Sequence, residues 1–314
     1  MNCGPFYGRH GRELKRWQAD LTLGGVALIW GSTFVVVQNA LDDVAPLTFV
    51  GFRFTFAALV LTALFVPRVR RITRREALSG ALIGVWLAGG YIFQTIGLQS
   101  TTTAKAGFIT GLSVVIVPLL ATVLLRRPPG RSPAVGILAA TVGLAFLSLD
   151  RNLRVQTGDL WVLACAVMFA LHIVSVAHFS PQSDAVRLAV AQIGMVAALA
   201  LVGSFVFETP RLTLPAAAWA AIGFTGVVAT ALVFTLQVYV QRFTTPTHTA
   251  LLFSLEPVFA AFFGWWWADE TLGLKELLGC GLILAGMIIA ELGDGPVPET
   301  GTEGRVPAQT SEVL

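Results

Sequence analysis

Long apolar stretches alternate with short polar links along most of the chain. Each stretch is about 20 residues long, the length that an α-helix needs to cross the ~30 Å hydrocarbon core of a bilayer. Helix-breaking prolines, such as Pro46 and Pro210, lie in the links. The pattern predicts an all-α polytopic membrane protein. Its ten predicted transmembrane helices are residues 21–40, 47–66, 77–98, 102–125, 132–149, 159–178, 185–206, 215–240, 247–268 and 276–293.

The composition supports this prediction. Of the 314 residues, 55% are hydrophobic and 12% are charged, and the mean hydropathy is +0.75. A soluble protein is about a quarter charged. The net charge of +3 comes from basic residues that cluster in the links, so we expect no nucleic-acid partner. Cys3, Cys165 and Cys280 form no C-x-x-C pair, so the sequence predicts neither a disulfide framework nor a metal site.

The distribution of Lys and Arg predicts how the chain is oriented. With the N-terminus inside, the inner segments hold fifteen of these residues and the outer loops hold four. Positive charge favours the cytoplasmic side, so we expect both termini in the cytoplasm and a multi-pass protein of the plasma (inner) membrane. Residues 1–18 form a basic cytoplasmic segment without the features of a cleavable signal peptide. The polar tail, residues 294–314, is predicted to be a disordered cytoplasmic segment.

The two halves of the chain also share an internal repeat, at offsets of 139 and 143 residues. Matched pairs include Asp20 with Asp159, Arg53 with Gln192, Gln94 with Gln237, Gly136 with Gly279, and Gly143 with Gly286. Each half holds five spans, an odd number, so the second half must enter the membrane in the opposite direction. The sequence therefore predicts two inverted repeats, residues 19–150 and 151–293, around a central cavity.

Several motifs in this order resemble the EamA family of the drug/metabolite transporter superfamily. They are Leu28–Phe34, Phe52–Phe54, Thr103–Phe108, Ser254–Ala260, Asp269–Glu270 and Gly279–Gly286. The resemblance covers residues 19–293 and implies a ten-helix permease that moves small metabolites, often by export of amino acids, bases or drugs. The first half departs from the pattern of the second, because Ser113-Val114 stands where the second half has Glu256-Pro257.

Glu256 is the main candidate for chemistry, because an ionisable group inside a span is costly unless it faces water or a partner. It lies near the middle of its predicted span and precedes Pro257. Pro257 has no N–H, so the carbonyl near Phe253 loses its partner and the helix can bend there, which makes Pro257 a candidate hinge. Two interpretations stay open. Glu256 contacts substrate or a coupling proton in the cavity, or it belongs to a structural kink.

Further candidates for substrate binding or coupling lie in other spans. Arg53 carries a fork of donors that suits a carboxylate, although near the outer end of its span it can also snorkel to the interface. Lys105 and His248 are partners in the repeat, and we consider them candidate gates at opposite mouths, although Lys105 can also snorkel to the interface. The other candidates are Trp30, Trp86, His172 and Gln192, which either face the cavity or pack between helices.

The sequence therefore predicts a secondary transporter that moves small solutes by alternating access, with export of amino-acid-like or other small solutes as the leading hypothesis. An intramembrane enzyme and a channel or sensor are the alternatives. The chain has no P-loop and no H-E-x-x-H motif, so we expect no enzyme activity, catalytic residues or cofactor. Expected partners are a small-molecule substrate, the lipid bilayer and a coupling proton, with the protein a monomer or homodimer.

Overall fold

The computed structural model describes residues 16–101, 103–126, 129–148, 156–267 and 273–293, and these residues contain helices and no strand. The basic segment before residue 16, Asp269–Glu270 and the tail at 294–314 lie outside the described residues. The helices of the first half are α1 (Arg16–Ala40), α2 (Pro46–Leu64), α3 (Val66–Val69), α4 (Arg74–Leu98), α5 (Thr103–Gly111), α6 (Ser113–Leu125) and α7 (Arg131–Ser148).

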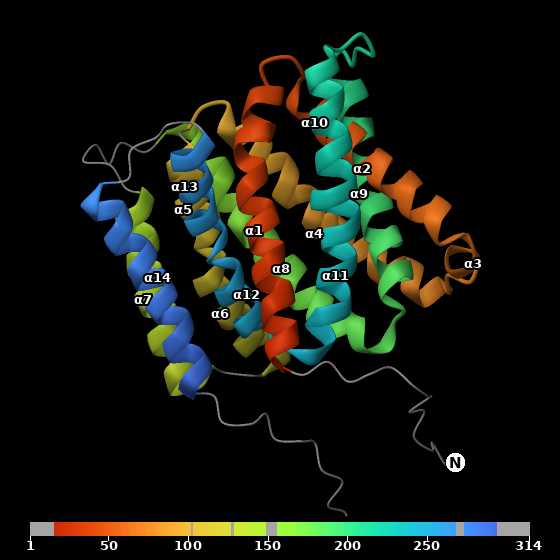
Figure 1. The fold of residues 1–314 in the computed structure, drawn as a ribbon. Coiled ribbons are helices and arrows are strands. Elements are labelled where there is room, and N and C mark those ends of the chain that lie inside the picture. The colour runs from red at the N-terminus through yellow and green to blue at the C-terminus, as the bar shows by residue number, and fades with distance from the viewer. Residues whose placement is uncertain (1–15, 102, 127–128, 149–155, 268–272, 294–314) are drawn as a thin grey trace, which may run out of the picture.

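The second half has helices that are linked in places by π-helical and 3-10-helical turns. They are α8 (Thr157–Phe179), η1 (Ser180–Gln182), α9 (Ala185–Phe207), α10 (Ala216–Gly226), the π-helical η2 (Val227–Leu232), α11 (Val233–Val240), η3 (Gln241–Phe243), α12 (Pro246–Phe253), α13 (Glu256–Trp267) and α14 (Leu274–Gly293). Figure 1 shows these helices as one bundle, in which α1 begins and α14 ends at the same end.

Six helical segments are long and apolar enough to cross a membrane, and three shorter apolar helices accompany them in the described residues. The architecture is that of a polytopic membrane protein. Two of the predicted spans differ from the prediction, because each is broken into two helices. The span predicted at 102–125 is divided into α5 and α6, and the one at 247–268 into α12 and α13.

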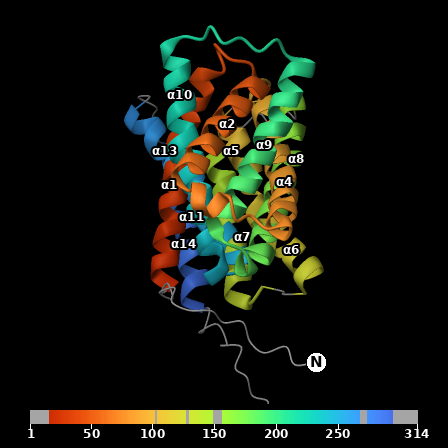
Figure 2. The same cartoon turned by 90° about the vertical axis from the view of Figure 1, so that its right-hand side faces the viewer.

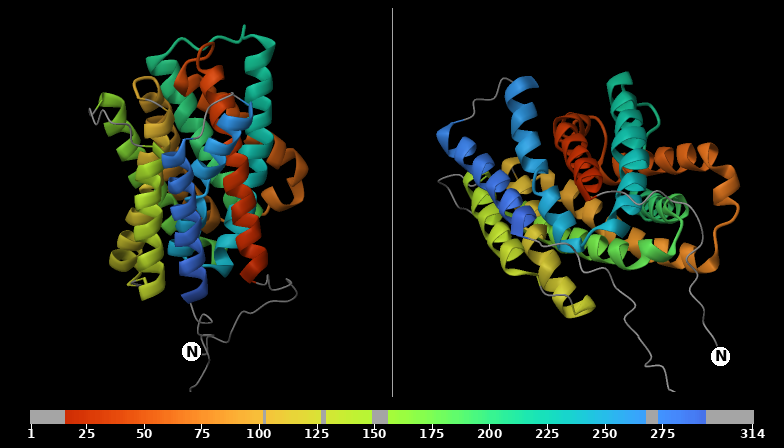
Figure 3. Two further views of the ribbon diagram at one scale, coloured as in Figure 1. Left: turned by 60° about the vertical axis from the view of Figure 1, so that its left-hand side comes forward. Right: turned by 60° about the horizontal axis from the view of Figure 1, so that its bottom comes forward.

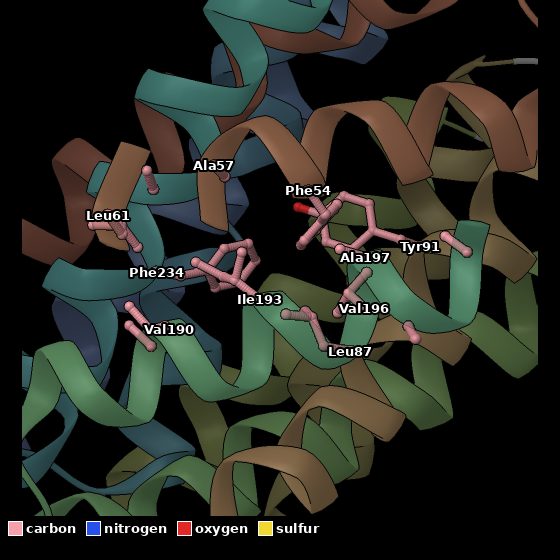
Figure 4. Packing of buried hydrophobic residues seen from close by; sticks show 14 of the residues in the cluster. Phe54, Ala57, Leu61, Leu87, Tyr91, Val190, Ile193, Val196, Ala197 and Phe234 are labelled. Atoms are coloured by element: carbon pink, nitrogen blue, oxygen red, sulfur yellow. The ribbon is translucent and has the colours of Figure 1, made fainter. Parts of the chain in front are cut away.

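Interhelical packing leaves large apolar side chains on the outside of the bundle. Leu59, Phe205 and Leu138 are among the exposed ones, as expected for a surface that contacts lipid. Inside, α9 packs against both α2 and α4 (Figure 2). The cluster between these helices and α11 includes Phe54 and Phe234 (Figure 4).

Helices α7 and α14 form a closely packed pair at one edge of the bundle (Figures 1 and 3). Glycines make the approach possible. A Cβ atom built on Gly286 would lie 2.6 Å from the carbonyl oxygen of Gly136, and one on Gly143 would lie 2.6 Å from that of Gly279. Small residues let helix backbones meet in a membrane, where lipid provides no hydrophobic force to drive association.

Two carboxylates join the halves at the two ends of α9. Glu208, just after α9, accepts hydrogen bonds from the backbone N–H of Leu47 and of Thr48, both at 2.8 Å. It thereby satisfies free N–H groups at the start of α2. At the other end, Glu76 accepts a bond from the N–H of Asp184 at 3.1 Å and pairs with Arg187 at 3.3 Å. These contacts fix α2, α4 and α9 relative to one another.

Candidate functional site

A cavity of about 90 Å³ lies inside the bundle, between α1, α2, α4, α5, α6, α8, α11, α12 and α13. Since one water needs roughly 10–15 Å³ by this measure, the cavity can hold several waters or a small solute. Most of its wall is apolar, and it includes the aromatic residues Trp30, Tyr91, Phe169, Phe234 and Phe253. Two residues of opposite formal charge, Arg53 and Glu256, also line it.

Residues next to the breaks of both broken helices line the cavity. Gly111 and Ser113 line it on either side of the break between α5 and α6, and Phe253 and Glu256 do so at the break between α12 and α13. The second break has a local cause, because Pro257 has no N–H to offer the carbonyl of Phe253. Glu256 is thereby placed in the first turn of α13, where the helix dipole favours a carboxylate.

Arg53 is buried in α2, with 3% of its surface exposed, and is held by several contacts. Its Nε donates to Thr230 Oγ1 at 2.7 Å, and its Nη2 donates to the carbonyl oxygen of Ala229 at 3.3 Å. The guanidinium carbon lies 4.9 Å from the ring centroid of Tyr91, a cation–π distance. Arg53 and Glu256 are both among the described residues, and no salt bridge within 4.0 Å joins them. The cavity therefore holds two opposite charges that do not neutralise each other by direct contact.

The sequence did not point to the residues that hold Arg53. Ala229 and Thr230 belong to the π-helical turn η2, and Tyr91 comes from α4. The stretch Val227–Leu232 is an ordinary apolar run apart from Thr230, and a π-helical turn has no recognisable sequence signature. A threonine within a span was the only available signal, and it usually bonds to its own helix, as Thr225 does here.

His172 and Gln192 form a polar pair between α8 and α9. His172 Nε2 and Gln192 Oε1 are 2.9 Å apart, and both side chains are buried. His172 lines the cavity, whereas Gln192 lies behind it. Phe234 packs edge-on against the imidazole, with 5.8 Å between the ring centroids. The structure thus brings five of the candidate residues together around one cavity: His172, Trp30, Arg53, Glu256 and Pro257. Gln192 lies behind the wall and contacts His172.

Other candidate residues lie elsewhere. Trp86 is half-buried on α4 but is not part of the cavity wall, which Leu87 of the same helix joins. Adjacent residues of an α-helix point about 100° apart, so Leu87 can line the cavity while Trp86 does not. The side chain of Lys105 lies outside the described residues, and its role stays a prediction. His248, near the start of α12, lies 2.8 Å from Asp20 Oδ1 of α1.

The cavity extends toward one end of the bundle. Its wall follows α1 from Trp30 to Val37 and includes Phe49 at the start of α2 and Leu98 at the end of α4. All of these lie toward the end where α1 finishes. At the opposite end, an apolar cluster that includes Leu23 fills the space between α1, α8, α11 and α12. The His248–Asp20 pair joins α1 to α12 at that end.

Comparison with known proteins places the chain in a family. The profile of the EamA-like transporter family matches it twice, at residues 17–149 and 156–291. An uncharacterized transporter of Archaeoglobus fulgidus is 35% identical over 280 residues, which cover 89% of this chain and 87% of the relative. The uncharacterized transporter YoaV of Bacillus subtilis is 26% identical over 277 residues, covering 84% of this chain and 93% of YoaV.

Two further similarities agree with this result. The uncharacterized inner membrane transporter YedA of Escherichia coli is 25% identical over 275 residues, covering 85% of this chain and 88% of YedA. One solved crystal structure superposes with a TM-score of 0.75 at 21% identity, over 88% of this chain and 98% of the other, which shows a common fold. The family resemblance inferred from the motifs is confirmed: this chain is a membrane protein that belongs to the EamA-like transporter family.

Proposed function

We propose that this protein is a secondary transporter that exports small amino-acid-like solutes across the inner membrane by alternating access. The observation that carries the proposal is the pair of opposite charges, Arg53 and Glu256, on the wall of one cavity without a salt bridge between them. Unpaired charges are costly away from bulk water, so a ligand that compensates both has a strong advantage.

A zwitterionic solute would satisfy both charges at once. Its carboxylate would bind the guanidinium of Arg53, and its ammonium group would bind the carboxylate of Glu256. The rings of Trp30, Tyr91 and Phe234 would contact its apolar part. A proton on Glu256 is the other way to neutralise that carboxylate. Proton and ammonium would then compete for one group, and this competition would couple export of the solute to entry of a proton.

Alternating access requires two halves that can rock against each other, and we propose the inverted repeats at 19–150 and 151–293 for this role. The two matches of the family profile support it. So do the glycines of α7 and α14, because Gly136 and Gly279 are 143 residues apart, as are Gly143 and Gly286. When each residue is replaced by its partner in the other half, the contact between Gly136 and Gly286 becomes the contact between Gly279 and Gly143.

In the conformation of this structure, the cavity would face the outside and the cytoplasmic end would be closed. His248 would act as a gate through its contact with Asp20, and Pro257 would act as the hinge beside the binding site. Return of the transporter to the inward-facing state would separate α1 from α12. The predicted cytoplasmic position of both termini places the start of α1 on the closed side.

A resistance screen followed by flux measurement tests this function. Overexpression in a sensitive bacterial host, challenged with toxic amino-acid analogues, purine analogues and cationic dyes, is expected to give resistance to the amino-acid analogues. The purified protein in proteoliposomes should then move the solute so identified with saturable kinetics and against its gradient when a pH gradient is applied. Flux that rises linearly with concentration, or single-channel current, would instead indicate a channel.

A further inference from the structure

The cavity wall beside Arg53 depends on an irregular turn that is not itself part of the wall. Residues Val227–Leu232 form a π-helical turn between α10 and α11, within which Ala229 and Thr230 are both 0% exposed. Single π-helical turns inside longer helices frequently occur at functional sites, because the wider turn changes which backbone groups and side chains face a neighbouring helix. Here the turn faces α1 and α2.

Three hydrogen bonds from two other helices converge on this turn. Arg53 of α2 donates from Nε to Thr230 Oγ1 at 2.7 Å and from Nη2 to the carbonyl oxygen of Ala229 at 3.3 Å. Trp30 of α1 donates from Nε1 to the same carbonyl at 3.0 Å. The orientation of two cavity residues, a guanidinium and an indole, is therefore set by one turn of the α10–α11 segment.

These contacts leave one side of the guanidinium for a ligand. The hydrogen bonds of Arg53 use Nε and Nη2, and none of them uses Nη1. Tyr91 covers a face of the guanidinium, with its hydroxyl oxygen 3.5 Å from Nη2. Nη1 carries two N–H donors, which suit an oxygen of a carboxylate or phosphate.

We infer that the π-helical turn is the positioning element of the anion-binding group in this cavity. Thr230 and the backbone of Ala229 hold Arg53 so that Nη1 points its donors at an anionic group of the ligand. Arg53 touches the ligand, and Thr230 acts only through Arg53. The inference rests on the proposed function, because it assumes that the cavity is where the solute binds, and it adds the residue that determines how tightly the anion is held.

Positioning matters because a free arginine side chain loses many rotamers when it binds a ligand. The bond to Thr230 fixes the side chain before the ligand arrives, so less conformational entropy is lost on binding. Without that hydroxyl, the Nε–H would be buried without its acceptor, and the guanidinium would turn to find another one. Its Nη1 donors would then leave the geometry that an anion needs.

The test measures binding of matched anionic and neutral probes to the purified full-length protein by ligand-induced thermal stabilisation. L-leucine and its methyl ester differ in the free carboxylate, and glycerol 3-phosphate and glycerol differ in the phosphate. We expect the wild-type protein to bind one of the two anions and to bind its neutral counterpart at least tenfold more weakly. Thr230→Val should weaken binding of that anion about tenfold, the usual effect of losing one hydrogen bond to a charged group.

Two variants separate positioning from general structure. Thr230→Ser keeps the hydroxyl and should restore anion binding to within about twofold of wild type. Thr225→Val removes a buried hydroxyl from the same segment, but that hydroxyl bonds to the carbonyl of Ala221 in its own helix, so anion binding should not change. If Thr230→Val does not fold, Thr230→Ala provides the comparison, because it also removes the hydroxyl that holds Nε and leaves Arg53 unchanged. It should likewise weaken binding of the anion while leaving the neutral probe unaffected.

Several results would overturn the inference. These are unchanged anion binding by folded Thr230→Val, an equal loss for the anion and its neutral counterpart, and failure of both anions to bind the wild-type protein. The last result is distinguishable from failure of the proposed function. Resistance to a cationic or neutral compound in the growth screen would support transport but not an anion-binding site. Anion binding without transport of any compound would support the anion-binding site and contradict the proposed function.

Discussion

The two broken helices of this protein break at matching sequence positions and differ in chemistry. The break between α5 and α6 is at Leu112, and the break between α12 and α13 includes Leu255, which is 143 residues later. Both breaks line the cavity. The first presents Ser113, whereas the second presents Glu256 followed by Pro257. Of the two helix breaks on the cavity wall, only one therefore carries a carboxylate, and we expect coupling to depend on that break.

The causes of the breaks also differ. Pro257 accounts for the second break, because it removes the N–H that the carbonyl of Phe253 needs. The first half has Val114 at the corresponding position, and the proline of that broken span, Pro118, lies within α6 past the break. No proline accounts for the break after Gly111, where Leu144 of α7 packs close to that glycine.

The largest expected effect on transport comes from comparing substitutions at the starts of α13 and α6, which both line the cavity. Glu256→Gln should reduce uphill transport in proteoliposomes to background, because the amide cannot exchange a proton. Ser113→Ala, at the matching position of the first half, should stay within about twofold of wild type, since it removes no charge from the cavity. Equal loss in both variants would mean that the difference between the breaks has no functional meaning.

The next effect concerns the hinge. Pro257→Ala restores the missing N–H and should favour a continuous helix from α12 into α13, moving Glu256 away from Arg53. A displacement of about 1 Å can cost roughly a hundredfold in rate, so we expect transport to fall by a factor of about ten to one hundred. Pro118→Ala, in α6, is the matched control and should have a much smaller effect. Transport rates of the two purified variants, compared at equal protein stability, provide the measurement.

A further comparison is between the two ends of the bundle. At the end away from the cavity, His248 of α12 contacts Asp20 of α1. If this contact closes the cytoplasmic end, Asp20→Asn should expose the cavity to that side more often. A Thr33→Cys reporter on the cavity wall, in a chain without other cysteines, would be labelled by a membrane-impermeant thiol reagent from either face of vesicles. We expect labelling from the cytoplasmic side to rise roughly threefold to tenfold, since a partly buried pair contributes on the order of 1 kcal/mol.

The exposed carboxylate Asp43 provides the control for that experiment. Asp43→Asn should leave labelling from both faces as in the parent chain, because the residue lies in the turn after α1 and outside the cavity wall. Unchanged cytoplasmic labelling in Asp20→Asn would contradict the gate. Labelling that rises equally from both faces would point to loss of structure and not to opening of one end.

The smallest effect tests the symmetry itself. Gly143→Ala and Gly286→Ala occupy matched positions in α7 and α14, and each added methyl group would meet a backbone carbonyl of the other helix at 2.6 Å. Overpacking of this kind costs about 1–3 kcal/mol, and the two losses should be equal if the halves are related by a twofold axis. Gly281→Ala faces open space and should cost nothing measurable. Thermal melting of the three variants is the measurement, and clearly unequal losses at Gly143 and Gly286 would argue against the symmetry.

Much of the architecture could be predicted from the sequence, because lipid requires long apolar helices with short polar links. Periodicity in the apolar stretches does not show where a helix breaks, however. Residues 102–125 are apolar throughout most of their length, and no proline marks the break at Leu112. Pro257 was the local signal that made the second break foreseeable.

The candidate site was predictable only in part, for a related reason. Charged residues such as Arg53 and Glu256 stand out in an apolar span whatever the fold, and the structure brings both to one cavity. Trp30 and Trp86 look equivalent in the sequence, but only Trp30 lines the cavity, because the direction of a side chain depends on how its helix is rotated in the bundle. Thr230 could not be recognised, since its role depends on a π-helical turn and on a partner far away in the sequence.

Proton release on substrate binding tests the central claim, that solute and proton compete for Glu256, most directly. The solute identified by the resistance screen would be added to purified protein in weakly buffered solution with a pH-sensitive dye. We predict release of about one proton per wild-type protein molecule, and none from Glu256→Gln at a solute concentration that saturates the variant. Substrate binding without proton release in the wild-type protein, or equal release from Glu256→Gln, would contradict this account.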